Sequence, residues 1–450
     1  MESVMSGFSY VIKRNGSKVP FTIDRITNAI YRAAVAIGER DKNVAKELAL
    51  KAVTCLEATY PPDHNPHIEE IQDCVEETII KQGLAELAKA YILYRSENKK
   101  RRDERARRFN YEDNIPWEKI WRTLRWAVNH DLHSIEALNA RIAKGQFADI
   151  VQESEAFYHS QVSDAADMIL DRSDSVRMVF VSGPSSSGKT TTTIKLEQKL
   201  NREGLRFVSL NVDNYFFDLS MHPRDEFGDY DFETPQALDL ALINDHLRRL
   251  MAGEEILVPR YDFPTGTRLP DQTPLRMHPG DILLIDSLHG LNRDFSKDID
   301  DRMKFRLYLE PLMQMQDRDG TFIRWTDIRM MRRMLRDEKF RAYNPEQTLL
   351  HWHYVRASEM RHIIPNNIIT DMIINSAMPY ELPIYQPQLV EHFAQWQRTY
   401  KDEPLREDAY NRAKRTYEVL KQISPVHSDA AVPADSVIRE FIGGSSLKYH

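Results

Sequence analysis

The residues whose types and spacing most clearly indicate chemistry are Gly183 to Thr190, which read Gly-Pro-Ser-Ser-Ser-Gly-Lys-Thr. They match the phosphate-binding loop pattern G-x-x-x-x-G-K-[ST] at every fixed position. An apolar, β-branched run at 176–181 precedes the loop, and a helical pattern follows at 191–200. The backbone N–H groups of such a loop wrap a polyphosphate at a helix N-terminus; Lys189 would reach the β- and γ-phosphates, and the Thr190 hydroxyl would bind Mg²⁺. The loop therefore predicts that the chain binds ATP or GTP.

Two aspartates follow apolar runs further along the chain. Asp213 ends the run Phe207–Val212, and Asp286 ends the run Ile282–Ile285. A carboxylate at the C-terminal end of a parallel strand faces the crevice where such folds bind ligands. One such aspartate could simply open a turn. Two of them downstream of a phosphate-binding loop favour a site that holds Mg²⁺ and accepts a proton from the phosphate acceptor.

Residues 329–341 are rich in arginine at helical spacing. Four arginines fall within two helical turns: Arg329, Arg332, Arg333 and Arg336. Guanidinium groups bind phosphate through two parallel hydrogen bonds. We therefore expect a lid that clamps the phosphates, with a solvated helix face as the alternative.

Two loop-like segments, 230–235 and 259–263, combine aromatic and acidic residues. Aromatic rings stack on flat or sugar-ring ligands, and carboxylates accept hydrogen bonds from hydroxyl groups. Both segments are candidates for the pocket of the phosphate acceptor. Aromatic residues in loops can equally serve as packing anchors.

The elements around these motifs divide the chain into four expected parts. Residues 8–96 combine a hairpin signal at Asn15-Gly16 with helical periodicity, and 97–172 begin with a basic run and continue as a helical connector. Strand and helix patterns alternate over 173–385, which predicts a parallel sheet with helices on both faces. Residues 386–450 read as a helical extension with a final short strand at 436–442. The basic run is expected to be a solvated helix end or linker.

Composition narrows the class of protein. The 450 residues carry a net charge of −7, which argues against broad binding to nucleic acid. Two cysteines, Cys55 and Cys74, are too few for a zinc ribbon or a disulfide framework, so a reducing cytoplasm is the expected location. No apolar run approaches the length of a membrane span, so no membrane partner is expected.

Together these motifs resemble the uridine kinase and phosphoribulokinase family of P-loop kinases over about residues 176 to 380. Five motifs in the family's order carry the resemblance: Gly183–Thr190, Val212–Phe216, Tyr230–Asp239, Pro259–Arg268 and Arg332–Arg341. The resemblance implies an α/β fold with the parallel sheet of P-loop NTPases. It also implies transfer of phosphate from ATP, with Mg²⁺, to a small-molecule acceptor.

The resemblance implies a role for each site residue. Asp213 would be the base that takes the proton from a 5′-hydroxyl, and Lys189 and Arg336 would be further catalytic residues. Asp286 stands in the place of the family's Walker B glutamate, so the implied metal ligands are Thr190, Asp213 and Asp286. The implied ATP-binding residues are Gly183, Ser185, Ser186, Ser187, Gly188, Lys189, Thr190, Thr191, Arg333, Arg336 and Arg341. The implied substrate-binding residues are Tyr215, Glu233, Tyr261 and Arg268.

The chain departs from the family's pattern at several positions. Gly266 stands where the family has the histidine that meets the pyrimidine base, so recognition of the base is left open. Asp286-Ser287-Leu288 replaces Glu-Gly-Ile, and Ala342 replaces a glycine after the lid arginine. The layout of 286–292 and 439–444 is most similar to the longer bacterial uridine kinase-related nucleoside kinases.

The N-terminal region resembles an ATP-cone, the small regulatory nucleotide-binding domain at the front of many ribonucleotide reductases. The matching segments are Val11–Gly16, Phe21–Ile26, Ile68–Glu76 and Ala88–Arg95. The resemblance implies an effector nucleotide at Lys13, Arg14, Gly16 and Arg25, and two cations on a hairpin beside a helical bundle would suit a triphosphate. A plain helical adaptor is the alternative. Such cones often act by changing oligomerisation, which makes a homo-oligomer the expectation.

We therefore expect an ATP- and Mg²⁺-dependent kinase that phosphorylates the 5′-hydroxyl of a nucleoside, with uridine and cytidine as the family's usual acceptors. Gly266 keeps open a different acceptor: a sugar, a sugar phosphate or another hydroxyl metabolite. A nucleotide-sensing regulator with little turnover is a third possibility, because ATP-cones also front a transcriptional repressor. The intact Lys189, Thr190, Asp213 and Asp286 argue against a regulator, as does the lack of four cysteines for the repressor's zinc ribbon.

Overall fold

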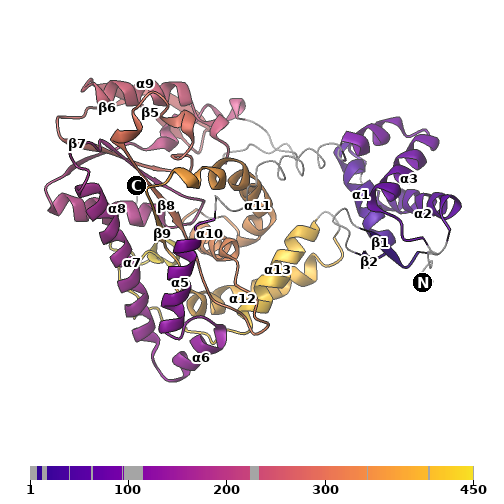
Figure 1. Ribbon diagram of the computed structural model, residues 1–450. Helices are drawn as coiled ribbons and strands as arrows, with labels where there is room; N and C mark the ends of the chain where they lie inside the picture. The colour runs from indigo at the N-terminus through magenta and orange to yellow at the C-terminus, as the bar shows by residue number, and fades with distance from the viewer. Residues whose placement is uncertain are drawn as a thin grey trace. The chain divides into compact units, whose positions relative to one another are not determined.

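The computed structural model describes residues 8–12, 18–39, 41–61, 64–93, 95, 115–222, 233–341, 343–403 and 406–448. The chain divides into two compact units, Met1–Asn110 with Glu403–Leu405, and Tyr111–Asp402 with Arg406–His450 (Figure 1). Among the described residues, no helix is both long enough and apolar enough to cross a membrane.

The first unit is a small hairpin with a helical bundle. Its elements are β1 (Tyr10–Ile12), β2 (Lys18–Pro20), α1 (Ile23–Ala36), α2 (Lys42–Thr59) and α3 (Ile68–Lys81). Residues 85–93 are helical as well. Strands β1 and β2 pair antiparallel, and the apolar stripes of the helices meet in one core around Ile30, Ala49, Leu56 and Ile79. The paired strands and the helices expected from the sequence are thus present, and the turn expected at Asn15-Gly16 lies outside the described residues.

The second unit is built on a five-stranded sheet in the order β4-β7-β3-β8-β9, in which every neighbouring pair is parallel. The strands are β3 (Met178–Ser182), β4 (Arg206–Ser209), β7 (Asp281–Ser287), β8 (Lys304–Glu310) and β9 (Met372–Asn375). The apolar runs at 176–182, 207–212, 281–285, 305–309 and 368–375 of the sequence predict all five strands. Strand β3 is central and fully buried, as its unbroken apolar run requires.

Each face of the sheet carries its own hydrophobic core, because successive side chains of a strand point to opposite faces. Val179 and Val181 of β3 pack into one core, and Met178 and Phe180 pack into the other. The first core also holds residues of α7 (Phe147–Leu170), α10 (Trp325–Arg341), α11 (Pro345–Ser358), α12 (Glu381–Thr399) and α13 (Glu407–Leu420). The second core is covered by α9 (Leu240–Met251) (Figure 1). The predicted sheet with helices on both faces is confirmed.

The helices expected as a connector belong to the same core as the sheet. They are α5 (Trp117–Asn129), α6 (Ile135–Ala143) and α7. Helix α7 buries Tyr158 and Ile169 in that core, so the boundary expected at 173 falls inside one packed unit. The boundaries at 96 and 385 stay predictions.

The final strand expected at 436–442 is wrong. The chain forms a short helix there, α14 (Arg439–Ile442). Val437, Ile438, Phe441 and Ile442 are all buried. They form two pairs of adjacent positions four residues apart, which is the pattern of a helical face, whereas a strand would bury every second residue.

A hairpin of β5 (Ile256–Asp262) and β6 (Thr267–Leu275) replaces what the sequence suggested was a loop. Strand β6 is exposed along most of its length, so it lacks the alternation of apolar and polar residues that marks a strand. Pro270 and Pro274 in β6 further weaken the strand signal.

Candidate functional site

The phosphate-binding loop joins the end of β3 to α8 (Lys189–Arg202), as its sequence predicted. Two of its positions require glycine. A side chain at Gly183 would bring its Cβ to 2.4 Å from the Leu309 carbonyl oxygen, and one at Gly188 would come to 2.5 Å from Val437 Cγ2. Gly188 also has φ of +90°, a left-handed conformation that favours glycine. The loop therefore turns tightly into the N-terminus of α8, where free N–H groups suit an anion.

Thr190 and Asp286 lie within hydrogen-bond distance, with the Thr190 hydroxyl donating to the Asp286 carboxylate at 3.1 Å. They meet because β3 and β7 are neighbours and Val181 pairs with Asp286 in register. Burial raises the pKa of Asp286 to about 6, and nearby Lys189 offsets part of this shift. Mg²⁺ prefers such hydroxyl and carboxylate oxygens.

Asp213 lies in η1 (Val212–Tyr215), one turn after β4. The main-chain N–H of Asp213 donates a hydrogen bond to the Asn211 side chain at 2.9 Å, which fixes this turn. The Asp213 side chain is open to solvent, yet surrounding protein atoms raise its pKa by desolvation. The charges of Lys189 and Arg341 act in the opposite direction. Asp213 thus shares one electrostatic neighbourhood with the phosphate-binding lysine.

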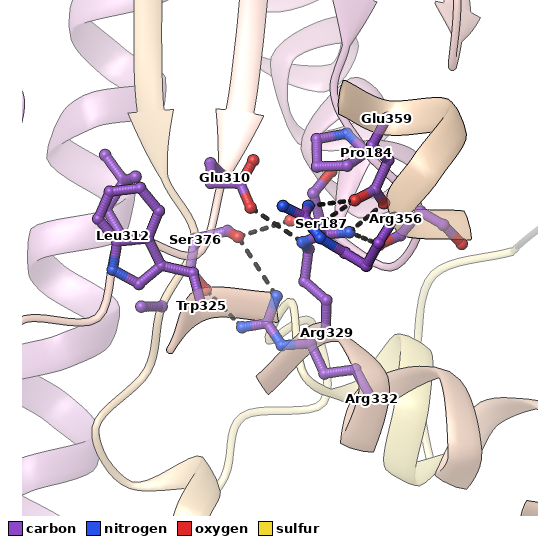
Figure 2. A network of polar contacts seen from close by, with 12 residues as sticks. Pro184, Ser187, Glu310, Leu312, Trp325, Arg329, Arg332, Arg356, Glu359 and Ser376 are labelled. Atoms are coloured by element: carbon purple, nitrogen blue, oxygen red, sulfur yellow. Dashed lines mark hydrogen bonds and ion pairs between the residues drawn. The ribbon is translucent and has the colours of Figure 1, made fainter. Parts of the chain in front are cut away.

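The lid of arginines is only partly as expected, because Arg329 and Arg332 are fully buried. Arg329 donates to Glu310 at 2.9 Å and to Glu359 at 2.9 Å (Figure 2). Arg332 donates to Glu381 at 2.6 Å. Their guanidinium donors are occupied by carboxylates, so they cannot clamp phosphate, and the prediction is wrong for these two residues. They instead join α10 to the rest of the unit.

Of the other three arginines, Arg333 and Arg336 are half-buried and Arg341 is exposed. Arg333 donates to Glu233 at 2.9 Å and to the Ser185 hydroxyl at 3.3 Å. The sequence analysis did not single out Asp337, yet this buried carboxylate contacts all three arginines, at 3.3, 2.8 and 3.5 Å. The spacing of four residues on either side of Asp337 is the signal that could have shown it. Their role at the ATP phosphates stays a prediction.

The four predicted substrate residues have different surroundings. Tyr215 is fully buried, and its hydroxyl hydrogen-bonds His246 Nδ1 at 2.9 Å. It therefore belongs to the core beneath α9, and its assignment as a substrate contact is corrected. Glu233 pairs with Arg333, and Arg268 pairs with Asp239 at 3.0 Å. These two stay predicted substrate contacts.

Tyr261 remains the strongest of the four. Its ring packs in an aromatic cluster against Phe216 and Phe263, with centroids 5.5 and 5.0 Å away. Its hydroxyl is buried and has no hydrogen-bond partner among the described residues. A buried donor without an acceptor is destabilising, so a polar ligand group at this position would stabilise the site.

Gly266 forms the turn between β5 and β6. Its N–H donates to the Asp262 carbonyl at 2.8 Å, and its own carbonyl accepts from Leu219 N–H at 2.8 Å. Its φ is +65°, and a Cβ here would lie 2.8 Å from Leu219 Cβ. A side chain at this position would be strained and would collide with Leu219, so this turn favours glycine over the family's histidine.

The sequence analysis missed Glu440 of α14. Its carboxylate accepts from the Thr191 N–H at 3.3 Å and from the Thr191 hydroxyl at 2.9 Å. Asp435 on the same segment pairs with Lys195 of α8 at 2.8 Å. Segment 435–442 therefore lies directly against the phosphate-binding loop and α8, which places an additional carboxylate there.

Three of the four residues expected to hold a regulatory nucleotide, Lys13, Arg14 and Gly16, lie outside the described residues. Arg25 is exposed in the first turns of α1. The effector site stays a prediction.

Two family models match this chain. Residues 9–100 match the ATP cone domain, and residues 178–382 match the phosphoribulokinase / uridine kinase family. Curated relatives include the uridine kinase of Deinococcus deserti, 29% identical over 198 residues that cover 44% of this chain and 86% of the relative. The uridine kinase of Chloroflexus aurantiacus is 29% identical over 197 residues, covering 44% of this chain and 85% of the relative.

Solved structures show only low similarity to this chain. A possible uridine kinase from Bacillus stearothermophilus has a TM-score of 0.34 and 16% identity, and covers 48% of this chain and 98% of that one. D-glycerate 3-kinase from Cryptococcus neoformans has a TM-score of 0.32 and 13% identity, and covers 45% and 87%.

The family assignment agrees with the loop, the paired strands and the acids described above. The kinase family uses ATP and transfers phosphate to a hydroxyl group. Residues 9–100 are thus an ATP-cone domain, and residues 178–382 are a domain of the phosphoribulokinase / uridine kinase family.

Proposed function

We propose that this kinase transfers the terminal phosphate of ATP to the 5′-hydroxyl of a nucleoside, uridine or cytidine. The observation that carries the proposal is the convergence of Lys189, Thr190, Asp213 and Asp286. Lys189 and Thr190 follow β3, Asp213 follows β4, and Asp286 lies near the end of β7. These three strands are neighbours and parallel, so the four residues meet at the carboxyl edge of the sheet. This is the edge of a parallel sheet where such folds bind ligands.

In the proposed reaction, the acceptor hydroxyl gives its proton to the Asp213 carboxylate. The oxygen of the acceptor hydroxyl then forms the new bond to the γ-phosphorus while the bond from this phosphorus to the leaving ADP oxygen breaks. The attacking and leaving oxygens lie in line. Lys189 and Arg341, which act electrostatically on Asp213, would stabilise the charge on the transferring group. The raised pKa of Asp213 makes its carboxylate a better proton acceptor than an ordinary aspartate.

The residues present fit Mg²⁺. Thr190 and Asp286 would hold it, with Asp213 nearby, and the bound ion would neutralise charge on the β- and γ-phosphates. Among the described residues, no group of three or more His, Cys, Asp or Glu side chains could hold a metal. A site of one or two carboxylates completed by phosphate oxygens is the usual arrangement for Mg²⁺ in kinases.

The nucleoside is supported by the relatives named uridine kinase and by the Tyr261 hydroxyl, which needs a polar partner. Glu233 would accept hydrogen bonds from ribose hydroxyls. Gly266 favours a second candidate, a sugar, sugar phosphate or other hydroxyl metabolite, because the family's base-contacting histidine is absent here. The ATP-cone would sense an effector nucleotide and adjust the kinase activity. We expect it to do so by changing the oligomeric state of the protein.

The experiment is ADP release with ATP and Mg²⁺ over a panel of nucleosides, sugars and sugar phosphates, with and without dATP. Turnover on uridine or cytidine supports the proposal, and an effect of dATP supports regulation by the cone. Turnover on a sugar or sugar phosphate alone supports the second candidate. No turnover on any member, with ATP binding intact, contradicts both and favours a nucleotide sensor.

A further inference from the structure

A cavity of about 760 Å³ lies between α10, α11 and α13, and none of its lining residues belongs to the phosphoryl-transfer site. Four arginines and two aspartates line it: Arg324, Arg356, Arg412, Arg415, Asp327 and Asp408. Trp325 and Phe322 add aromatic surface. Its size falls within the range of small-molecule sites.

The charges of this cavity are not balanced. Arg415 pairs with Asp327 at 2.7 and 2.8 Å, and Arg412 pairs with Asp408 at 2.6 Å. Those two pairs use both aspartates. Arg324 is exposed, and no side-chain hydrogen bond or ion pair joins it to another described residue. The cavity thus offers a positive charge that no lining carboxylate neutralises.

Two buried donors on its walls also lack acceptors. Trp352 is 1% exposed, and its indole Nε1 has no hydrogen-bond partner among the described residues. The same is true of Arg412 Nε. Unsatisfied buried donors are destabilising. Donors without acceptors beside an unpaired guanidinium are what an anionic ligand rich in oxygen would satisfy.

We propose that this cavity binds a small phosphorylated molecule that carries a flat ring. The phosphate would pair with Arg324 and Arg356, and the ring would lie against the tryptophan and phenylalanine surface. The proposal concerns a second site, and it does not depend on which acceptor the kinase phosphorylates.

This site is joined to the phosphate-binding loop by a short chain of contacts (Figure 2). Arg356 pairs with Glu359, and Glu359 pairs with Arg329. Arg329 Nη1 donates to Glu359 and also to the Ser185 carbonyl, at 3.1 Å. An anion that binds Arg356 breaks the ion pair between Arg356 and Glu359. Arg329 is then the arginine that stays paired with Glu359. The shared Nη1 then turns toward Glu359, its bond to Ser185 weakens, and the loop binds ATP less tightly.

Phenyl phosphate is a suitable probe, because it carries one flat ring and one phosphate. Its binding to the full chain is measured by titration calorimetry for the wild type, Arg324→Glu and Lys189→Ala, with Arg398→Glu as a control. Arg398 is an exposed arginine outside the cavity. We expect Arg324→Glu to weaken binding by about tenfold or more, because it reverses the unpaired charge. Lys189→Ala and Arg398→Glu should leave it within about twofold.

Trp352→Phe is a second variant, which keeps a ring and removes the Nε1 donor. It should weaken binding by about threefold, as the loss of one hydrogen bond does. Equal binding by the wild type and Arg324→Glu overturns the proposal. So does loss of binding in Lys189→Ala, because the probe would then occupy the phosphate-binding loop.

The link to the loop is tested by ATP affinity at saturating phenyl phosphate. The dissociation constant for ATP should rise about fivefold in the wild type and stay unchanged in Arg324→Glu. An unchanged constant in the wild type contradicts the coupling. An equal rise in both proteins indicates competition at the loop and also contradicts it.

Discussion

Glu440 accepts hydrogen bonds from both the main-chain N–H and the hydroxyl of Thr191, at 3.3 and 2.9 Å. The two residues are 249 positions apart, so the contact depends entirely on the fold. It places a carboxylate at the N-terminus of α8, where the loop offers N–H groups to phosphate. It also adds to the negative charge that raises the pKa of Asp286.

The first prediction concerns this carboxylate. Glu440→Gln keeps the size of the side chain and removes a negative charge beside the phosphates, so ATP should bind about three- to tenfold more tightly. Titration of ATP at low salt measures the change, with the exposed Glu338→Gln on α10 as the control. Weaker ATP binding in Glu440→Gln would show instead that the carboxylate holds the loop in its binding shape.

The second prediction concerns Gly188. Gly188→Ala would bring a Cβ to 2.5 Å from Val437 Cγ2 at a φ of +90°, so it should destabilise the protein and abolish ATP binding. Gly204→Ala is the matched control, because Gly204 has the same φ with nothing within 4 Å. Urea unfolding should show a cost about 1–3 kcal/mol greater at Gly188. Adding Val437→Ala should recover part of that difference, and equal costs at the two glycines would contradict the packing argument.

The third prediction concerns the buried pair of Arg332 and Glu381. Removing one partner leaves an uncompensated buried charge, so Arg332→Met should cost about 3–5 kcal/mol of unfolding free energy. The double variant with Glu381→Leu should be less destabilised than Arg332→Met alone, because neither charge remains. Denaturant unfolding of both variants decides this. A double variant that is less stable than the single one would mean that the hydrogen bond that Glu381 accepts from the Met378 N–H matters more than relief of the unpaired charge.

The fourth prediction is a dependence of stability on pH. Burial of His289 lowers its pKa to about 3, whereas an unfolded histidine has a pKa of about 6.5. Between these values the unfolded chain binds one more proton than the folded chain. Stability therefore rises with pH through this window and is lost as the pH falls from about 6.5 toward 3.

His289→Leu should make the unfolding free energy less dependent on pH in this window, with a slope reduced by up to about one proton. Unfolding measured at a series of pH values tests this. The exposed His427→Leu serves as the control, and its slope should match that of the wild type. An unchanged slope in His289→Leu would show that the buried imidazole is already protonated in the folded protein.

The phosphate-binding loop and the five strands could be predicted because local patterns determine them. The loop carries fixed glycines, and each strand is a short apolar run between polar segments. The family resemblance also implied one site for Thr190 and Asp286, and their side chains are in hydrogen-bond contact. These predictions needed no knowledge of distant contacts.

The errors have a common physical origin in distant partners. Arg329 and Arg332 lie on the same helix as Arg333. They differ from it because carboxylates from other elements pair with them inside the protein: Glu310 and Glu359 with Arg329, and Glu381 with Arg332. A run of arginines cannot reveal which of its members will be paired.

The contact of Glu440 with Thr191 and the burial of Tyr215 were missed for the same reason. Both depend on elements that lie far away in the chain, α14 for Thr191 and α9 for Tyr215. The β5–β6 hairpin was missed because its outer strand is exposed and contains prolines, so it lacks the usual pattern.

The most direct test of the account is turnover by Asp213→Asn. The amide keeps the shape of Asp213 but cannot accept the acceptor's proton as a carboxylate does, so kcat on the best acceptor of the panel should fall by about 10²–10⁴-fold. The affinity for ATP should stay within about threefold, and the exposed Asp298→Asn should behave as the wild type. Normal turnover by Asp213→Asn would contradict the assignment of Asp213 as the base, and with it the proposed mechanism.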